Sequence, residues 1–447
     1  MRKEFSNAPI GVFNNPNYIN YVVQYQGDIA KDAELSSKYY ITVINDEYAV
    51  ITMPFDKIIN DRYFLSDNPF PSVVYISRYY IYSLEEEVDK ESISPIIASN
   101  IINFHDIEPL NLTGKGTVVG IIDTGIDYLN KEFLNKDGTT RILSIWDQTI
   151  NVDSKTKSVP FGEEYSAQEI NNAIKAFNEG KSPYDIVPSK DEIGHGTSMA
   201  GVIGARGENK EIIGAAPECD FVVVKLSRAL SIEKSIITKG PIYDKACIML
   251  ALKYLFDYVV EKNVPMIIYL PLGTTLGNQK VNGILEDFID DICNNIGIAV
   301  ITGVGNEANA GNHASGVISN VGDFTDVDLY VSEEQSFIRA EVWIDNFSDP
   351  KYNQIDIAAG GINVKTTGVN NTVVTMNGTC VSAAVVAGAS ALMFQWAIVE
   401  KNDPGIYAQT LKSYLLRGTI KRSNDIYPNP QLGFGILDLV GVFGNLE

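Results

Sequence analysis

The stretch Val118–Asp127, VVGIIDTGID, decides the fold. It opens with an uninterrupted, mostly β-branched apolar run, which predicts a strand buried on both faces of a parallel sheet. Asp123 comes directly after that run, at the carboxyl end of the strand, where open α/β sheets place their catalytic and binding groups. Taken alone, an aspartate at a strand end is more often a turn residue. The stretch therefore predicts an α/β fold and offers Asp123 as a candidate site residue.

Two further segments carry residue types that could complete a catalytic site. Gly194–Gly201, GHGTSMAG, places His195 between two glycines at the start of a helix of small residues. Asn377–Gly388, NGTCVSAAVVAG, places Cys380 shortly after a glycine, at the start of a run of small and β-branched residues. A cysteine in such a helix is commonly a small core side chain. The order of aspartate, histidine and nucleophile, each in its own segment, is nevertheless that of a catalytic triad. The joint pattern predicts that Asp123, His195 and Cys380 form the catalytic group.

These segments and their order resemble the subtilisin-like serine proteases, the subtilases, from about residue 97 to the end of the chain. The resemblance implies a parallel sheet with helices on both faces. It also implies that Asn306 is the side-chain donor to the oxyanion and that Leu272 and Gly273 bind the substrate backbone. Subtilases carry serine at the position of Cys380, so the nucleophile of this chain is degenerate.

The chain ahead of the subtilase-like part divides into two pieces. Residues 1–17 are polar, contain Asn-Pro and Asn-Ala pairs, and are expected to be a flexible lead-in. Residues 18–95 contain several strand-like runs and a turn signal at Asn45–Glu47, which indicates a small α/β unit. Subtilases carry a prodomain at this place, so the resemblance implies a retained prodomain that occupies the substrate cleft. Residues 96–447 are then the subtilase-like domain.

Within the family, the chain resembles the clostridial Csp proteins of spore germination, and among these the CspA-type pseudoproteases, over Phe394–Val399, Leu411–Gly418 and Gly433–Leu439. The resemblance implies a β-rich, jelly-roll-like insertion ahead of the nucleophile. Residues 313–352 supply only part of it: Phe337–Ile344 is typical of an opening strand, and the chain then passes to the apolar run at 355–359. The rest of the insertion and one strand of the core sheet are expected to be missing, which would expose a sheet edge.

Composition limits the classes of partner. The net charge of −21 argues against nucleic acid or an anionic membrane as partner. No uninterrupted apolar span of ~18 residues predicts a membrane helix, and the polar first residues do not suggest a secretory signal. Four cysteines without metal-ligand spacing predict reduced thiols, with no metal and no cofactor. The resemblance to Csp proteins implies a location in the spore.

Three hypotheses for the function differ in the role of Cys380. The first is a pseudoprotease that acts by protein binding in germination signalling, with its own prodomain in the cleft and with other Csp proteins or a cortex hydrolase precursor as partners. The second is a thiol-dependent endopeptidase that processes that precursor, since a thiolate forms readily beside a histidine. The third is a serine protease whose nucleophile has been exchanged. Because a misplacement of ~1 Å can cost roughly a hundredfold in rate, the larger sulfur favours the first.

Overall fold

The computed structural model describes most of the chain. The described residues are 6–9, 11–32, 39–54, 70–77, 80–83, 94–106, 110–151, 159–229, 241–273, 284–303, 337–343, 356–423, 425–428 and 432–446. Asn306 and residues 313–336 and 344–352 lie outside them, so the predicted oxyanion donor and most of the predicted insertion are not placed.

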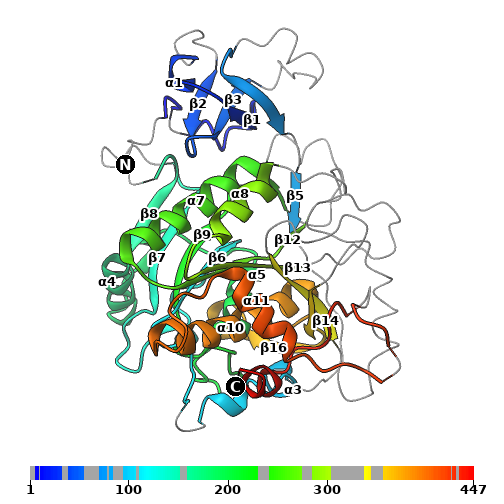
Figure 1. Cartoon of the computed structure of the whole chain (residues 1–447). Helices are drawn as coiled ribbons and strands as arrows, with labels where there is room; N and C mark the ends of the chain where they lie inside the picture. Colours follow the sequence, from blue (N-terminus) through cyan, green and yellow to red (C-terminus); the bar gives the residue numbers. More distant parts are fainter. Residues whose placement is uncertain are drawn as a thin grey trace.

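The centre of the molecule is a sheet of eight described strands in the order β15-β14-β13-β11-β6-β9-β7-β8 (Figure 1). Its strands are β6 (Val118–Asp123), β7 (Ile142–Asp147), β8 (Glu163–Ser166), β9 (Asp220–Lys225), β11 (Met266–Leu270), β13 (Ile298–Gly303), β14 (Phe337–Trp343) and β15 (Ile357–Gly360). The five strands from β13 to β7 are parallel, and β8, β14 and β15 join antiparallel at the two edges. The predicted strand at Val118 is confirmed as β6, in the middle of the sheet.

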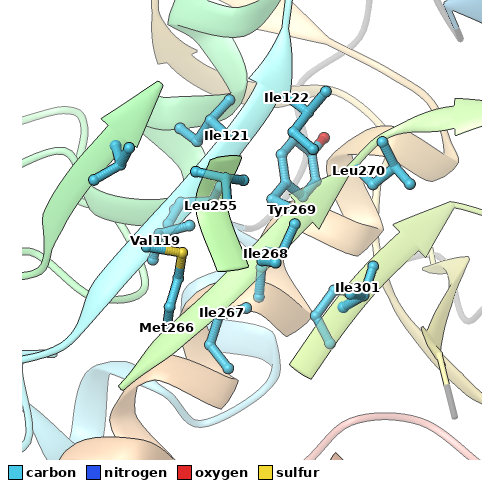
Figure 2. Packing of buried hydrophobic residues seen from close by; sticks show 14 of the residues in the cluster. Val119, Ile121, Ile122, Leu255, Met266, Ile267, Ile268, Tyr269, Leu270 and Ile301 are labelled. Atoms are coloured by element: carbon cyan, nitrogen blue, oxygen red, sulfur yellow. The ribbon is translucent and has the colours of Figure 1, made fainter. Parts of the chain in front are cut away.

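Both faces of the sheet are covered by helices, which explains the continuous apolar runs of its strands. In Figure 1, α7 (Lys245–Lys262) and α8 (Ile284–Cys293) lie on one side, and α10 (Thr379–Phe394) and α11 (Ala408–Arg417) lie on the other. Figure 2 shows Leu255 of α7 packed among the strand residues. A Cβ at Gly120 of β6 would lie 2.8 Å from the Cδ1 atom of Leu255, so the glycine leaves the space that this side chain fills. The α/β fold with helices on both faces is confirmed.

Small residues let α10 and a neighbouring helix, α5 (His195–Gly204), pack closely against other segments of the chain. A Cβ at Gly388 of α10 would lie 2.3 Å from the Cβ of Ala215, and one at Gly201 of α5 would lie 2.4 Å from the Oγ1 atom of Thr366. The segment Thr379–Val399 is apolar and long enough to cross a membrane, but 89% of its most apolar window is buried inside the molecule. Its apolar character is therefore explained by its place at the centre of the fold.

The front of the chain forms a second, antiparallel sheet with its own core, which we call the front unit. Its strands are β1 (Tyr18–Tyr25), β2 (Tyr40–Val43), β3 (Tyr48–Pro54) and β4 (Val73–Ser77), in the order β2-β3-β1-β4, with the short helix α1 (Ile29–Asp32). The Asn45 side chain accepts hydrogen bonds from the backbone N–H groups of Glu47 and Tyr48 at 2.9 and 2.7 Å, so the turn predicted between β2 and β3 is confirmed.

Part of the lead-in, at Phe13 and Asn14, packs on the main body. Phe13 is buried and stacks on Phe161, with ring centroids 4.2 Å apart. The side-chain amide of Asn14 donates to the carbonyl of Gln148 at 2.8 Å, and its oxygen accepts from the hydroxyl of Ser227. The prediction of a flexible lead-in is thus wrong for this stretch, because its aromatic ring and amide find partners on the body.

One short strand links the front of the chain to the body. β5 (Tyr80–Ser83) lies between β10 (Ile242–Asp244) and β12 (Leu272–Gly273) and pairs antiparallel with both. Tyr82 pairs with Ile242 on one side and with Gly273 on the other. We call the space between β10 and β12 the slot; in this structure β5 fills it.

The described part of the expected insertion lies in the central sheet. β14 pairs with β13, with Trp343 opposite Val300, and with β15, with Ala340 opposite Ile357. The expectation that this strand opens a separate β-rich insertion is therefore wrong for Phe337–Trp343. The same strand extends the central sheet beyond β13, where it pairs antiparallel. An antiparallel strand can be joined to its neighbour by a short connection, whereas a parallel strand needs a long crossover.

Candidate active site

Asp123 and His195 form a buried hydrogen-bonded pair at the carboxyl end of β6. The Nδ1 atom of His195 lies 2.8 and 2.9 Å from the two carboxylate oxygens of Asp123, and the two residues are 2% and 1% exposed. Gly196 permits this approach, since a Cβ there would lie 2.1 Å from the carbonyl oxygen of Gly125. The structure thus brings the predicted acid and base together from segments 72 residues apart.

A second buried carboxylate, Asp191, holds this pair in place. It accepts four hydrogen bonds: from the Thr124 hydroxyl and the Gly194 N–H, both at 2.8 Å, and from the N–H and hydroxyl of Thr197 at 2.8 and 2.7 Å. Thr124 follows Asp123, and Thr197 lies in the same helical turn as His195. Asp191 therefore ties the loop after β6 to the start of α5. Sequence reasoning missed it, because Asp191 lies three residues ahead of the N-cap Gly194 and so outside the usual helix-start pattern.

Cys380 completes the group at the second position of α10, where it is 0% exposed. Burial alone would lower the pKa of His195, because desolvation disfavours the imidazolium. The charge and hydrogen bonds of Asp123 oppose this effect, and Cys380 adds to them, so the pKa of His195 is raised well above its ordinary value.

The second ring nitrogen of His195 is the one available to a nucleophile. Among the described residues the Nε2 atom is buried and has no partner at regular hydrogen-bond geometry. Cys380 acts on the His195 ring through a side-chain hydrogen bond and through charge. A histidine that is fixed by a carboxylate and lies beside a thiol is placed to take the proton of that thiol. The three residues have the order and arrangement needed for nucleophilic chemistry.

Leu272 and Gly273, the predicted substrate-binding residues, form β12 and pair with Ser83 and Tyr82 of β5. β10, the other wall of the slot, was not predicted. It ends at Asp244, whose side chain accepts from the N–H of Ala246 at 3.3 Å and caps α7. The slot binds an extended strand through backbone groups, the mode of peptide recognition by strand addition.

Asn306, the predicted oxyanion donor, lies outside the described residues. Over the described ranges, no group of three or more His, Cys, Asp or Glu side chains is arranged to hold a metal ion. All four cysteines are buried.

Comparison with known proteins agrees with this geometry. The pattern of the Subtilase family matches residues 114–435. A thermostable alkaline protease of Halalkalibacterium halodurans is 29% identical over 205 residues, which are 45% of this chain and 47% of the relative. An intracellular serine protease of Paenibacillus polymyxa is 28% identical over 228 residues, 50% of this chain and 61% of the relative. The chain thus spans less than two thirds of the length of either relative.

Two solved structures share the fold. The CspB protease of Clostridium perfringens superposes with a TM-score of 0.63 and 21% identity, over 78% of this chain and 96% of that one. Fervidolysin of Fervidobacterium pennivorans, a keratinolytic enzyme related to subtilisin, superposes with a TM-score of 0.61 and 13% identity, over 100% of this chain and 62% of that one. At these identities the likeness is one of fold. With the family pattern spanning most of its length, the chain belongs to the subtilase family.

Proposed function

We propose that this chain is a subtilase-like pseudoprotease that acts by binding another protein in clostridial spore germination signalling. The observation that carries the proposal is Cys380, a thiol at the position from which the nucleophile would face His195. A site arranged for a hydroxyl accepts the larger sulfur with longer bonds to both the base and the substrate carbonyl. Since ~1 Å of misplacement can cost roughly a hundredfold in rate, we expect no physiological proteolysis.

The filled slot supports the same proposal. β5 belongs to the uncut chain and pairs along both β10 and β12, so a peptide substrate would have to displace it. We propose that the front unit is the retained prodomain and that it remains docked. The lead-in supports this, because Phe13 and Asn14 attach the front of the chain to the body at a second place.

The partners and the location follow from the resemblance to Csp proteins. The C-terminal segments resemble that group, and the CspB protease of Clostridium perfringens has a similar fold. We propose other Csp proteins or a cortex hydrolase precursor as partners, in the spore. The net charge of −21 fits a protein partner better than a nucleic acid.

A thiol-dependent endopeptidase is the second candidate, and the Asp123–His195 pair favours it. Both carboxylate oxygens lie within 2.9 Å of Nδ1, and Cys380 lies beside the ring. Such an enzyme would process the precursor of a cortex hydrolase. A site without any activity does not need this geometry, so the acid and base have to be tested together with the thiol.

The test is the intact mass of freshly expressed wild type, Cys380→Ser and Cys380→Ala. An uncut wild type beside a self-cleaving Cys380→Ser protein means that one atom silences an assembled site, as proposed. Three uncut proteins also support binding as the function. A wild type that removes its own front unit, while Cys380→Ala does not, overturns the proposal in favour of the thiol enzyme. Loss of germination by Cys380→Ala alone would contradict it independently.

A further inference from the structure

We infer that Tyr269 is a positioning residue for the nucleophile, and that its hydroxyl orients the first turn of α10 so that Cys380 faces His195. Tyr269 lies on β11 and is 0% exposed. Its hydroxyl donates to the backbone carbonyl of Cys380 at 2.8 Å. The inference rests on one part of the proposed function, the assignment of Cys380 as the nucleophile position, and it holds whether or not the site cuts peptide.

The packing of Tyr269 in the sheet does not require its hydroxyl. Its neighbours in the adjacent strands are Ile121 of β6 and Ile301 of β13, and Figure 2 shows its ring among these apolar side chains. An apolar ring would satisfy such packing without a polar atom to bury. A buried hydroxyl costs free energy unless it is hydrogen-bonded, so its partner is informative. That partner is the main chain of the nucleophile residue.

The carbonyl of Cys380 does not need Tyr269 for helix formation. Within α10 the carbonyl of each residue accepts from the N–H four residues later, and Ala384 has such an N–H. The hydroxyl is therefore a second donor on an oxygen that already has one. A second donor adds direction, because it resists rotation of the peptide unit that follows the Cα of Cys380. That rotation would swing the thiol relative to the Nε2 atom of His195.

Other contacts fix the chain on either side of Cys380. The N–H of Gly378 donates to the carbonyl of Gly361 at 2.9 Å, and the hydroxyl of Ser382 donates to the carbonyl of Ala359 at 3.0 Å. Thr379 packs against Gly303, where a Cβ would lie 2.9 Å from the threonine Oγ1 atom. The hydrogen bond from Tyr269 acts on the Cys380 peptide itself.

The hydroxyl also remains a donor at every relevant pH. Burial, together with the charges of Cys380 and Asp123, raises the pKa of Tyr269 well above its ordinary value. The group therefore stays protonated and keeps its hydrogen bond to the carbonyl of Cys380.

The test compares Tyr269→Phe with Tyr128→Phe in the full chain. Tyr128 is a matched control: it is also buried, and its hydroxyl donates to the backbone carbonyl of Val187 at the same 2.8 Å. The readout is the pH profile of alkylation of Cys380 by iodoacetamide, followed by peptide mass spectrometry, with the three other buried cysteines as internal references. This readout needs no protease activity.

We expect Tyr269→Phe to slow alkylation of Cys380 roughly tenfold and to displace its pH profile, because the thiol no longer faces the imidazole. Tyr128→Phe should leave the profile in place although it loses a similar buried hydrogen bond. A superimposable profile for Tyr269→Phe, or equal displacement in both variants, would overturn the inference. Self-cleavage of the wild type would contradict the pseudoprotease function and leave this inference standing.

A third protein covers the case in which Tyr269→Phe does not fold. 4-Aminophenylalanine at position 269 keeps a donor of similar reach but a weaker one. If Tyr269→Phe folds, the alkylation profile of the 4-aminophenylalanine protein should lie between those of wild type and Tyr269→Phe. If Tyr269→Phe does not fold, the profile of the 4-aminophenylalanine protein should still be displaced from that of wild type. A profile identical to wild type in the latter case would count against a role for donor strength and overturn the inference.

Discussion

Asp244 makes the docking of the front unit dependent on pH. It lies at the end of β10 and is buried, and Asn20 of β1 hydrogen-bonds to it through both its side chain and its backbone. In the slot, Asp244 pairs with Tyr80 of β5 in the antiparallel register. The charged groups near it are Lys245, which follows it in the chain, and Arg228, which lines the same small pocket. The titration of this carboxyl is therefore coupled to contact with the front unit.

The size of the effect follows from the burial. Desolvation raises the pKa of Asp244 from 3.8 to about 6, against the hydrogen bonds from Asn20 and Ala246 and the charge of Lys245, which lower it. A carboxyl whose pKa is raised on docking stabilises the docked state fully at a pH below its ordinary pKa. This stabilisation is lost as the pH rises through the pKa that the carboxyl has in the docked state. At about 1.4 kcal/mol per tenfold change in proton affinity, docking should weaken by up to about 3 kcal/mol between pH 4 and 8.

The assay is hydrogen exchange of peptides from β1 and β5, comparing wild type with Asp244→Asn at each pH. Asparagine does not titrate and can still cap α7. The protection of β1 and β5 in wild type, divided by their protection in Asp244→Asn, should therefore fall as the pH rises. Asp220→Asn is the matched control. Burial also raises the pKa of Asp220 to about 6, the nearby Arg141 lowering it, but Asp220 lies on β9, which pairs with β6 and β7 of the central sheet. A wild-type to Asp244→Asn ratio that is constant from pH 4 to 8 would refute the reasoning.

Three further predictions concern packing and positioning. Gly388→Ala should lower the free energy of unfolding by about 1–3 kcal/mol, since its Cβ would meet Ala215, whereas Gly444→Ala, which meets open space, should leave the urea midpoint unchanged. Asp191→Asn turns an amide N–H₂ toward hydrogen-bond donors and should lower the free energy of unfolding by about 2–4 kcal/mol. The low-field proton resonance expected for the buried His195 should disappear, and an intact resonance would contradict the positioning role of Asp191. Phe13→Ala removes a stacked, buried ring and should cost about 3 kcal/mol of attachment, seen as faster limited proteolysis ahead of β1; unchanged cleavage would show that the stacking is dispensable.

The main features of the fold could be predicted because their signals are local. The apolar run ending at Asp123 specifies a buried strand by itself, and His195 and Cys380 each open a helix of small residues. The likeness to subtilases then brought these three segments together. Their contact in the structure is a consequence of the sheet order, which the periodicity of one strand does not contain.

The parts that sequence reasoning missed depend on pairing between distant segments. The run Phe337–Trp343 has the composition of a strand in either a jelly roll or a core sheet, and only its partners β13 and β15 decide between them. Asp191 reads as a polar loop residue until Thr124, from another segment, is placed beside it. Phe13 and Asn14 lie in a polar stretch, and their order comes from contacts with residues more than a hundred positions away.

Because β5 is tethered to the body by its own chain, any free peptide that enters the slot competes with an intramolecular ligand. A short tether gives such a ligand an effective concentration in the millimolar range. A peptide partner present at micromolar concentration would therefore occupy only a small share of the slots unless it bound about a thousandfold more tightly than β5. We expect a protein partner to recognise surfaces outside the slot, so that the bound strand keeps β10 and β12 closed and gives the partner a single conformation to bind.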